Sequence, residues 1–474
     1  MLYNSALLNS PDTIAAVSTP HGQGGIAVIR ISGKDAFDVC KKIFKPAKAS
    51  VSFPAEGQKN ANIIFGRIYR GEEILDEILI STFLAPHSYT GENMVEISCH
   101  GSLYIQQEII KLLLANGCRL AKAGEFTQRA FFNGKLDLSQ AEAVGDLIAA
   151  SSAMSHRVAM QQMRKGFKHE LATLRDQLLN FTSLIELELD FSDEDVEFAD
   201  RVQLKDLAQQ IAAAIRRLVD SFAVGNAIKN GIPVAIVGET NAGKSTLLNR
   251  LLKEERAIVS EIHGTTRDAI EDTVIIDGLM FRFIDTAGIR ETYNTIEQLG
   301  IERSFQKIEQ SSIVLWVIDL TNDTQKTDQL AKQIISRAES KKLILTLNKA
   351  DKLTCEELKA KIENYKLFHE DYIVISAKSA ADVATLERKL IETANIPQIG
   401  ENDVIVTNLR HYGALAKALT AIERVIEGLD TNISGDLLSQ DIRECLSFLN
   451  EITGQQISTE DVLGNIFSRF CVGK

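Results

Sequence analysis

The segment Gly238–Ser245 reads Gly-Glu-Thr-Asn-Ala-Gly-Lys-Ser and has the spacing G-x-x-x-x-G-K-[ST] of a phosphate-binding loop. An apolar run before it, residues 232–237, predicts a buried strand, and the residues after it predict a helix. The glycines let backbone N–H groups face a polyphosphate, Lys244 would reach the β- and γ-phosphates, and Ser245 would bind Mg²⁺. The sequence therefore predicts a nucleoside triphosphate site formed by Asn241, Ala242, Gly243, Lys244, Ser245 and Thr246.

Two later segments point to guanine. Asn348-Lys349-Ala350-Asp351 follows a predicted strand at 343–347, and Ser376-Ala377-Lys378 follows another at 372–375. A carboxylate such as Asp351 at the end of a buried strand can accept hydrogen bonds from guanine N1–H and N2–H₂, whereas adenine would leave it unpaired. A backbone N–H of the second segment could donate to guanine O6. Because both segments follow a phosphate loop in this order, the predicted ligand is GTP.

A fourth segment, Asp285-Thr286-Ala287-Gly288, follows an apolar strand at 280–284. That strand is predicted to pair with residues 273–276 through a hairpin at Asp277-Gly278. Asp285 would hold Mg²⁺ through a water molecule, and the N–H of the glycine that ends the segment would sense the γ-phosphate.

A second protein ligand of Mg²⁺ is expected from Gly264-Thr265-Thr266-Arg267-Asp268, between the phosphate loop and Asp285. Thr266 is the predicted ligand. Its loop is expected to be ordered only while the γ-phosphate is present.

Ile289 stands where Ras-type GTPases place a glutamine that orients the attacking water. An apolar side chain cannot orient water, so hydrolysis uses another residue of the chain, uses a residue of a partner, or is slow. The polar candidates nearby are Arg290, Glu291 and Glu297, and each can equally be an ordinary solvated charge.

Asn241 lies three residues before Lys244. Its carboxamide oxygen could face the region that bridges the β- and γ-phosphates, where a monovalent cation would then offset charge as an arginine finger does elsewhere. The alternative is an asparagine that only satisfies a turn. The chemistry of the residue leaves both roles open.

Together these motifs resemble those of the MnmE/TrmE tRNA-modification GTPases, and the resemblance covers nearly the whole chain. It includes both ends of the sequence and the G-domain core. The matching segments are Asp12–Ala16, Gly24–Gly33, Tyr89–Glu92, His100–Gly101, Gly124–Phe131, Lys135–Ala143, Asn241–Ser245, Gly264–Asp268 and Cys471–Lys474.

The resemblance implies a potassium-stimulated GTPase whose G domains pair across their nucleotide faces. Glu297 would be the catalytic carboxylate that organises the attacking water, with Arg290 as a supporting residue. The K⁺ ligands implied are Asn241, Ser260, Ile262 and Thr265. The loop that closes over the nucleotide would contribute Ser260, Glu261, Ile262, His263, Gly264, Thr265 and Thr266.

The family's biological role is also implied by this resemblance. Such proteins form homodimers and act with a flavin-dependent partner, MnmG/GidA, in a heterotetramer. Together the two proteins modify the wobble uridine of certain tRNAs at C5, which gives its carboxymethylaminomethyl form.

The resemblance further implies an N-terminal site for a reduced folate, 5-formyltetrahydrofolate or a related compound, made by Arg30, Glu96, Lys135 and Lys474. A pterin offers a guanine-like edge to a carboxylate, and its glutamate tail suits arginine or lysine. Without the resemblance, Arg30 and Lys135 would be taken as surface charges. Cys471 either takes part in the modification chemistry or only supports the C-terminal lysine.

A chain of 474 residues is long enough for about three domains. The predicted fold is multidomain α/β, with an N-terminal α/β folate-binding-like domain, an all-α helical domain and an inserted Ras-like P-loop GTPase domain. The N-terminal dimerisation and folate-binding domain is predicted at 1–130 and the G domain at 226–397. The helical domain is predicted in two parts, 131–225 and 398–474, because seventy-odd C-terminal residues seldom form a core alone.

The composition excludes several classes of protein. Hydrophobic residues make up 45% and charged residues 24%, as in ordinary globular proteins. No apolar run reaches the ~18 residues of a membrane span, and we expect no signal peptide, because the start lacks a basic segment. Six cysteines without C-x-x-C spacing indicate neither zinc nor disulfides, so a cytoplasmic protein is expected. The C-terminal Cys471-Val472-Gly473-Lys474 does not fit a prenylation motif.

The net charge of −12 argues against a broad basic surface for RNA. A tRNA would then be bound mostly by the partner protein, with local basic patches assisting. Residues 157–168 are one such patch, and the alternative is that they form a solvated helix face. Two other functions predict different properties of the chain. A ribosome-assembly GTPase predicts a basic RNA-binding appendage, which the C-terminal helices do not resemble. A nucleotide-gated scaffold predicts hydrolysis unresponsive to K⁺ and to Glu297→Ala.

Overall fold

The computed structural model divides into two compact units. The first holds Met1–Gly145, Gln162–Leu207 and Ala421–Lys474, and the second holds Asp146–Gln161 and Ala208–Thr420. The structure describes residues 12–48, 53, 61–164, 166–190, 201–254, 271–284, 305–322, 324–366, 369, 371–397, 399–400, 403–431, 433–454, 470 and 473.

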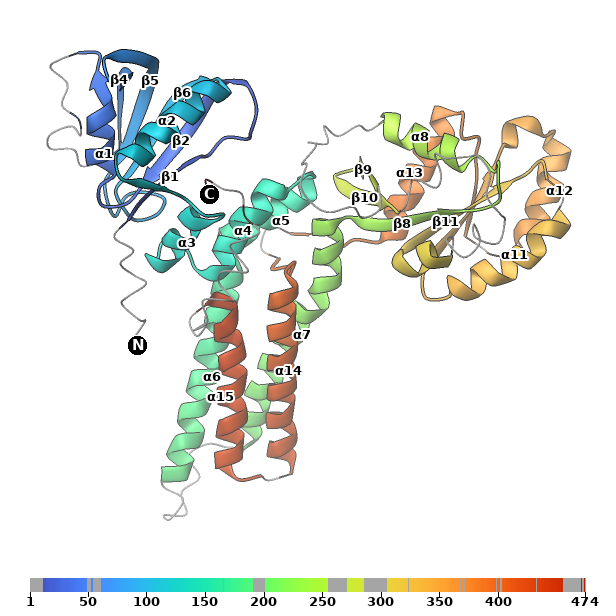
Figure 1. Ribbon diagram of the computed structural model, residues 1–474. Helices are drawn as coiled ribbons and strands as arrows, with labels where there is room; N and C mark the ends of the chain where they lie inside the picture. Colours follow the sequence, from blue (N-terminus) through green and yellow to red (C-terminus); the bar gives the residue numbers. More distant parts are fainter. Residues whose placement is uncertain are drawn as a thin grey trace. The chain divides into compact units, whose positions relative to one another are not determined.

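The first unit contains a seven-stranded sheet in the order β3-β4-β5-β6-β2-β1-β7 (Figure 1). Neighbouring strands are antiparallel except β1 and β7. Apolar runs at 26–31, 63–69, 77–83 and 94–98 predict strands, and all four are confirmed. The sequence does not predict β1, β3 and β7, because strands of three to five residues show no clear period. The strands are β1 Thr13–Val17, β2 Gly24–Ser32, β3 Phe44–Pro46, β4 Asn62–Arg70, β5 Glu73–Phe83, β6 Met94–Gly101 and β7 Cys118–Leu120.

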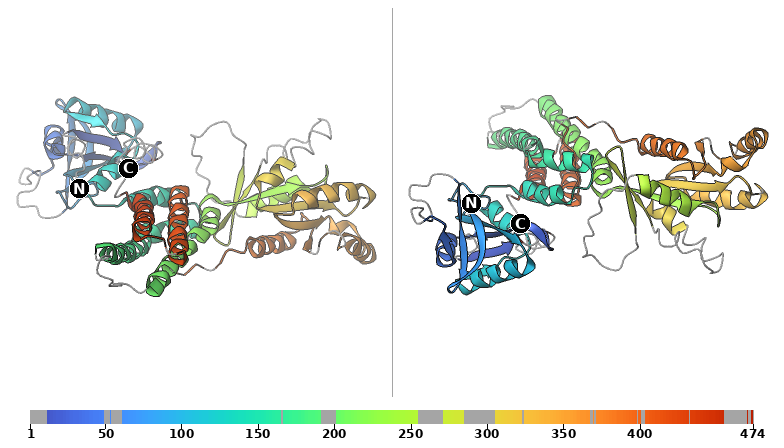
Figure 2. Two further views of the ribbon diagram at one scale, coloured as in Figure 1. Left: turned by 90° about the horizontal axis from the view of Figure 1, so that it is seen from below. Right: turned by 90° about the horizontal axis from the view of Figure 1, so that it is seen from above.

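Helices α1 (Ala36–Ile43) and α2 (Leu103–Ala115) cover one face of this sheet (Figures 1 and 2). Their buried residues, such as Cys40 and Ile109, join those of the strands in one apolar core. The apolar pattern of residues 102–115 predicts a helix, which is confirmed as α2. Removal of this apolar surface from water is what holds helices and sheet together.

Buried charges connect the segment before β1 to the helix α3 (Glu125–Phe132). The Arg129 guanidinium donates to Asp12 (2.9 Å), Glu92 (3.1 Å) and Glu125 (3.1 Å). Arg119 bonds Asp12 and Glu125 as well, each at 2.7 Å. Charged hydrogen bonds of this kind have defined geometry. Three of the segments that carry the family resemblance therefore have a structural role, because they fix one another within this domain.

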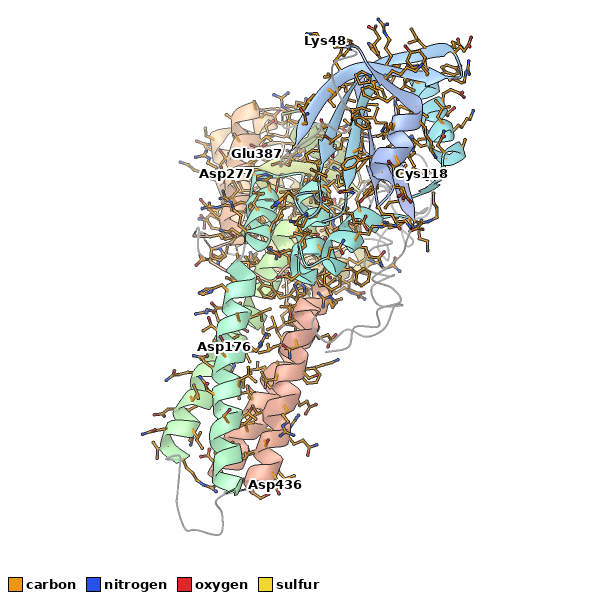
Figure 3. The ribbon with its side chains drawn as sticks, turned by 90° about the vertical axis from the view of Figure 1, so that its left-hand side faces the viewer. Lys48, Cys118, Asp176, Asp277, Glu387 and Asp436 are labelled. Atoms are coloured by element: carbon orange, nitrogen blue, oxygen red, sulfur yellow. The ribbon has the colours of Figure 1, made fainter. Side chains whose placement is uncertain are left out.

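Long helices make up the rest of the first unit and part of the second. Helices α6 and α15 lie side by side, and Asp176 on α6 and Asp436 in the first turn of α15 identify them in Figure 3. Apolar residues recur every three or four positions along α6 and predict a buried stripe, and Leu171, Leu178 and Phe181 are buried. No helix in the described part of the chain is long and apolar enough to cross a membrane. The helices are α4 Leu138–Ala149, α5 Ala153–Met163, α6 Gly166–Asp190, α7 Arg201–Asn230, α14 Leu409–Asp430 and α15 Gly435–Thr453.

The second unit contains a six-stranded sheet in the order β13-β12-β11-β8-β10-β9, parallel except for β9. Helices α8 and α13 share an apolar core with one face, and α11 and α12 share another core with the opposite face (Figure 1). Helices on both faces are expected of a parallel sheet, whose strands are buried on both sides. The elements are β8 Ile232–Val237, α8 Lys244–Glu254, β9 Asp272–Ile276, β10 Leu279–Phe283, β11 Ile313–Asp319, α11 Thr324–Arg337, β12 Lys342–Asn348, α12 Cys355–Lys366, β13 Tyr372–Val374 and α13 Ala380–Ala394.

Candidate nucleotide-binding site

The predicted phosphate loop joins the central strand β8 to the start of α8, as the sequence indicated. Its two glycines are required by close packing. Gly238 has a φ of 145°, and a Cβ there would lie 2.1 Å from the carbonyl oxygen of Val317. Gly243 has a φ of 101°, and a Cβ would lie 2.2 Å from Nδ2 of Asn348. The loop therefore runs directly against the ends of β11 and β12, at the edge where ligands bind in open α/β sheets.

The ammonium group of Lys244 points back into this loop. Its Nζ donates to the carbonyl oxygens of Gly238 (2.8 Å) and Glu239 (2.7 Å). Burial, aided by the nearby Lys307 ammonium, lowers the pKa of Lys244 to about 8. Phosphate oxygens would favour the charged form, so nucleotide binding must raise this pKa.

This shift predicts a pH-dependent nucleotide affinity. Lys244 is already protonated below its pKa of about 8, so affinity is highest there. Above that pH the dissociation constant should rise, by up to about tenfold per pH unit. We would measure GDP binding from pH 7 to 9 at constant ionic strength, with Lys244→Arg as control, since arginine stays charged throughout. Parallel profiles for the two proteins would contradict the prediction.

Asn348 connects the two loops that were assigned to phosphate and to base. Its side chain is 2% exposed. Its Nδ2 donates to the Ala242 carbonyl (2.7 Å), and its Oδ1 accepts from the N–H of Ala377 (2.9 Å). The sequence placed Asn348 among the GTP-binding residues, and in the structure both ends of its amide bind the protein. Its contribution to the site is therefore to hold the loops in position.

Lys349 and Asp351 follow at the end of β12. Lys349 adopts the left-handed conformation, with a φ of 65°, and its Nζ lies 2.5 Å from Oδ2 of Asp319. Asp351 lies in the short 3₁₀ helix η2 (Ala350–Lys352), and its side chain is exposed. The sequence predicts a buried carboxylate at this position, which is wrong, because Asp351 follows the strand by three residues and has left the sheet core. Burial of Asp351 would therefore have to come from the base that it binds.

The backbone of Ser376–Lys378 is largely engaged within the protein. The Ser376 N–H donates to Asp382 (2.7 Å), and the Ala377 N–H donates to Asn348. The Lys378 N–H makes a long contact of 3.4 Å with the Ser376 hydroxyl. Of the three, the Lys378 N–H is the most loosely held donor for guanine O6.

Asn241 has a φ of 64°, a conformation that asparagine tolerates better than most residues. This conformation agrees with the role in a turn. The side chain is exposed, so the carboxamide is accessible to a cation. The role in binding K⁺ stays a prediction.

Magnesium would be held here mainly by nucleotide oxygens and few protein groups, the usual arrangement for this cation. Among the described residues no group of three or more His, Cys, Asp or Glu side chains could hold a metal ion. Ser245 lies at the start of α8, where a hydroxyl ligand is expected.

Several predicted site residues lie outside the described residues. The hairpin that leads to Asp285 is confirmed, since Ile276 pairs with Leu279 and both turn residues have positive φ. The residues outside are Ser260, Glu261, Ile262, His263, Gly264, Thr265, Thr266, Asp285, Thr286, Ala287, Gly288, Arg290, Glu297, Cys471 and Lys474.

Two of the four predicted folate residues, Arg30 and Glu96, meet on the N-terminal sheet. Arg30 donates to Oε1 of Glu96 through Nε (3.0 Å) and Nη2 (2.9 Å). Its Nη1 reaches the carbonyl of Gly473 (3.4 Å), the residue before Lys474. The ring of Tyr89 lies 5.2 Å from the guanidinium. A cation, a carboxylate and an aromatic ring thus converge next to Gly473, a set that fits an anionic aromatic ligand.

Lys135, the fourth predicted folate residue, makes a different contact. Its Nζ donates to the Pro86 carbonyl (2.9 Å), and its side chain is exposed. The structure gives no direct bond between Lys135 and the Arg30–Glu96 pair. Its assignment to the folate site stays a prediction.

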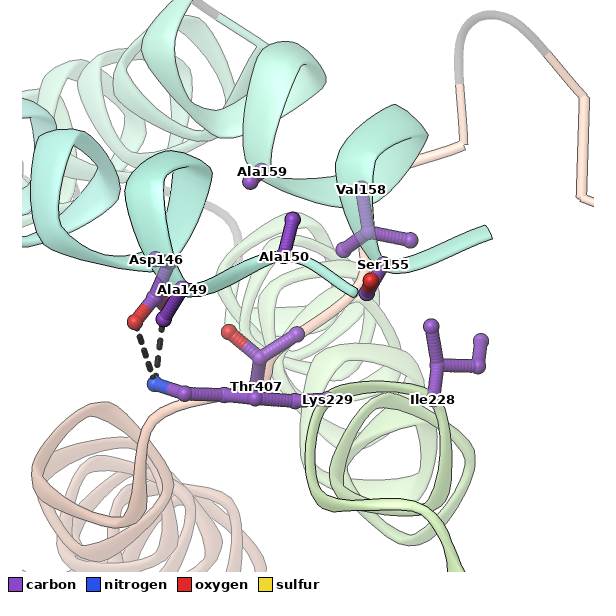
Figure 4. A pocket seen from close by; sticks show the side chains of 9 residues that line it. All are labelled: Asp146, Ala149, Ala150, Ser155, Val158, Ala159, Ile228, Lys229 and Thr407. Carbon is purple, nitrogen blue, oxygen red and sulfur yellow. Dashed lines mark hydrogen bonds and ion pairs between the residues drawn. The ribbon is translucent and has the colours of Figure 1, made fainter. Parts of the chain in front are cut away.

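A cavity elsewhere in the second unit is too small for a nucleotide. It has a volume of about 30 Å³, on the scale of a single water molecule (Figure 4). Lys229 and Asp146 form an ion pair of 2.7 Å at its wall. This pair joins α7, just before β8, to α4.

Two family models match the chain. The model described as "MnmE helical domain" matches residues 138–471, and the model described as "GTP-binding protein TrmE N-terminus" matches residues 13–135. The first match encloses the six-stranded sheet, so the G domain is inserted between helical segments.

Curated relatives match over nearly their full length. A protein named "tRNA modification GTPase MnmE" from Bacteroides thetaiotaomicron is 59% identical over 466 residues, which cover 98% of this chain and 99% of the relative. The protein of that name from Bacteroides fragilis is 58% identical with the same coverage. A solved structure of Era from Aquifex aeolicus bound to GDP.AlF4⁻ is 26% identical and covers 40% of this chain and 65% of its own, with a TM-score of 0.27.

Proposed function

The chain belongs to the MnmE family of tRNA modification GTPases and is a GTP hydrolase, and on this premise we propose that it couples GTP hydrolysis to tRNA modification. The product proposed is the carboxymethylaminomethyl form of the wobble uridine, made together with the flavin-dependent protein MnmG/GidA. One observation carries the nucleotide-binding part of the proposal: Asn348 joins the phosphate loop with Lys244 to the proposed base-binding loop at one edge of the sheet. The tRNA part rests on the family.

In the proposed hydrolysis, Lys244 and the start of α8 bind the phosphates, and Ser245 would hold Mg²⁺, which neutralises phosphate charge when bound. Asn241 is the proposed K⁺ ligand from the phosphate loop, together with Ser260, Ile262 and Thr265. The cation would stabilise negative charge on the leaving group during G-domain pairing. Arg290 and Glu297 act on the attacking water, in place of the glutamine that is missing at position 289.

The proposed assembly is a homodimer that binds a reduced folate on each N-terminal domain. The Arg30–Glu96 pair supports this part of the proposal, because a carboxylate can grip a pterin edge and a guanidinium can hold a glutamate tail. The C-terminal residues would complete the site, since Gly473 packs against Val17 and Arg30.

The test is a reconstituted modification reaction with the full-length protein, MnmG/GidA, tRNA and a reduced folate. We expect modified wobble uridine with GTP and none with a non-hydrolysable GTP analogue or with the Lys244→Ala variant. Modification that continues at an equal rate without GTP would contradict the proposed coupling.

A further inference from the structure

We propose that Asp319 is a positioning residue for guanine specificity: through Lys349 it fixes the turn that presents Asp351 to the base. The inference rests on the proposed function, since it deepens the account of the same nucleotide site. Asp319 belongs to none of the sequence motifs that predicted this site.

Asp319 is the last residue of β11 and is 5% exposed. Its Oδ1 accepts hydrogen bonds from the N–H (2.9 Å) and the hydroxyl (2.6 Å) of Thr321, and its Oδ2 accepts from Nζ of Lys349 (2.5 Å). Burial opposes ionisation, yet the bonds from Lys349 and Thr321 hold the pKa of Asp319 below its usual range. The group is therefore a buried carboxylate anion in one fixed orientation, which can serve as an anchor.

Lys349 needs such an anchor because its backbone conformation is disfavoured. With φ of 65° and ψ of 33°, it adopts a left-handed conformation that residues other than glycine seldom adopt. This conformation turns the chain out of β12 into η2, the helix that holds Asp351. The ion pair with Asp319 stabilises Lys349 in this turn, so it also determines where the Asp351 carboxylate lies.

The loop that follows Asp319 is itself held from two sides. The N–H of Leu320 donates to the Asn348 carbonyl (3.1 Å), which continues the pairing of β11 with β12. From α12, Nζ of Lys361 donates to the carbonyls of Leu320 and Asn322. Because the loop is constrained in this way, the Asp319 carboxylate has a fixed position and holds the Lys349 ammonium in place.

The same loop also contacts the phosphate loop. Nδ2 of Asn322 lies 3.2 Å from Oε2 of Glu239. Residues 319–322 thus touch both the phosphate-binding and the base-binding side of the site. We assign specificity to Asp319 rather than Asn322, because the Asn322 side chain is exposed and contacts Glu239 rather than the base-binding loop.

The test compares Asp319→Asn with the wild-type full-length protein for binding of GDP, IDP and ADP. IDP lacks the 2-amino group, so the GDP/IDP affinity ratio reports how well Asp351 meets guanine N2–H₂. We expect this ratio to fall by roughly tenfold in Asp319→Asn, which corresponds to loss of one charged hydrogen bond. Asp371→Asn breaks a partly exposed ion pair with Lys389 in the same unit and should leave the ratio unchanged.

The outcomes separate positioning from general damage. A GDP/IDP ratio that stays at the wild-type value in Asp319→Asn overturns the inference, even if all three nucleotides bind more weakly. If Asp319→Asn does not fold, Lys349→Met removes the same ion pair and must lower the ratio instead. A wild-type protein that does not prefer GDP over ADP would overturn the proposed function itself.

Discussion

The Asp351→Asn variant is expected to prefer xanthine nucleotides over guanine nucleotides. The carboxylate of Asp351 can accept two hydrogen bonds, which matches N1–H and N2–H₂ of guanine. An asparagine offers one acceptor and one donor, which matches N1–H and the C2 carbonyl of xanthine. In the guanine complex the N–H₂ group of the asparagine would face the N2–H₂ group of the base, so two donors would meet. GDP affinity should therefore fall by about 100-fold or more.

Competition of GDP and xanthosine diphosphate (XDP) against one labelled nucleotide measures this change of base preference. The Asp371→Asn variant, altered in the same unit but at the opposite ends of the strands, serves as a control that should still prefer GDP. An Asp351→Asn protein that retains the wild-type preference for GDP would remove Asp351 from base recognition.

The strand–loop–helix at the phosphate loop could be predicted from sequence because its signals are local. Six apolar residues precede two glycines at fixed spacing, and each acts on its own neighbours. The hairpin at Asp277-Gly278 was predictable for the same reason, since this pair favours positive φ at both positions. Local periodicity also gave α2 and the apolar stripe of α6.

Contacts between distant residues could not be predicted in this way. Asn348 bonds Ala242, which lies 106 positions earlier, and Arg30 reaches the carbonyl of Gly473, 443 positions later. No repeating sequence pattern relates the two residues of either pair. Asp319 is an intermediate case: an aspartate at the end of a buried strand in this sheet is a recognisable signal, but its partner Lys349 is known only from the fold.

The Glu297→Ala variant is expected to bind GTP and to lose nearly all turnover. Ile289 offers the attacking water no hydrogen bond, so a carboxylate is needed to orient it, and a single acid–base group typically contributes about 10²–10⁴-fold. Glu291→Ala is the matched control, because Glu291 is a neighbouring carboxylate with no assigned role and should retain turnover. Equal losses in the two variants would show a general effect of charge near Ile289 instead of a role for Glu297.

GTP turnover of the purified protein in K⁺ against equal Na⁺, with Glu297→Ala measured alongside, tests the central claim most directly. We predict strong stimulation by K⁺, abolished in Glu297→Ala while GTP is still bound. Equal and slow rates in both salts would contradict cation-stimulated hydrolysis, leave Asn241 as a turn residue, and indicate a nucleotide-gated scaffold.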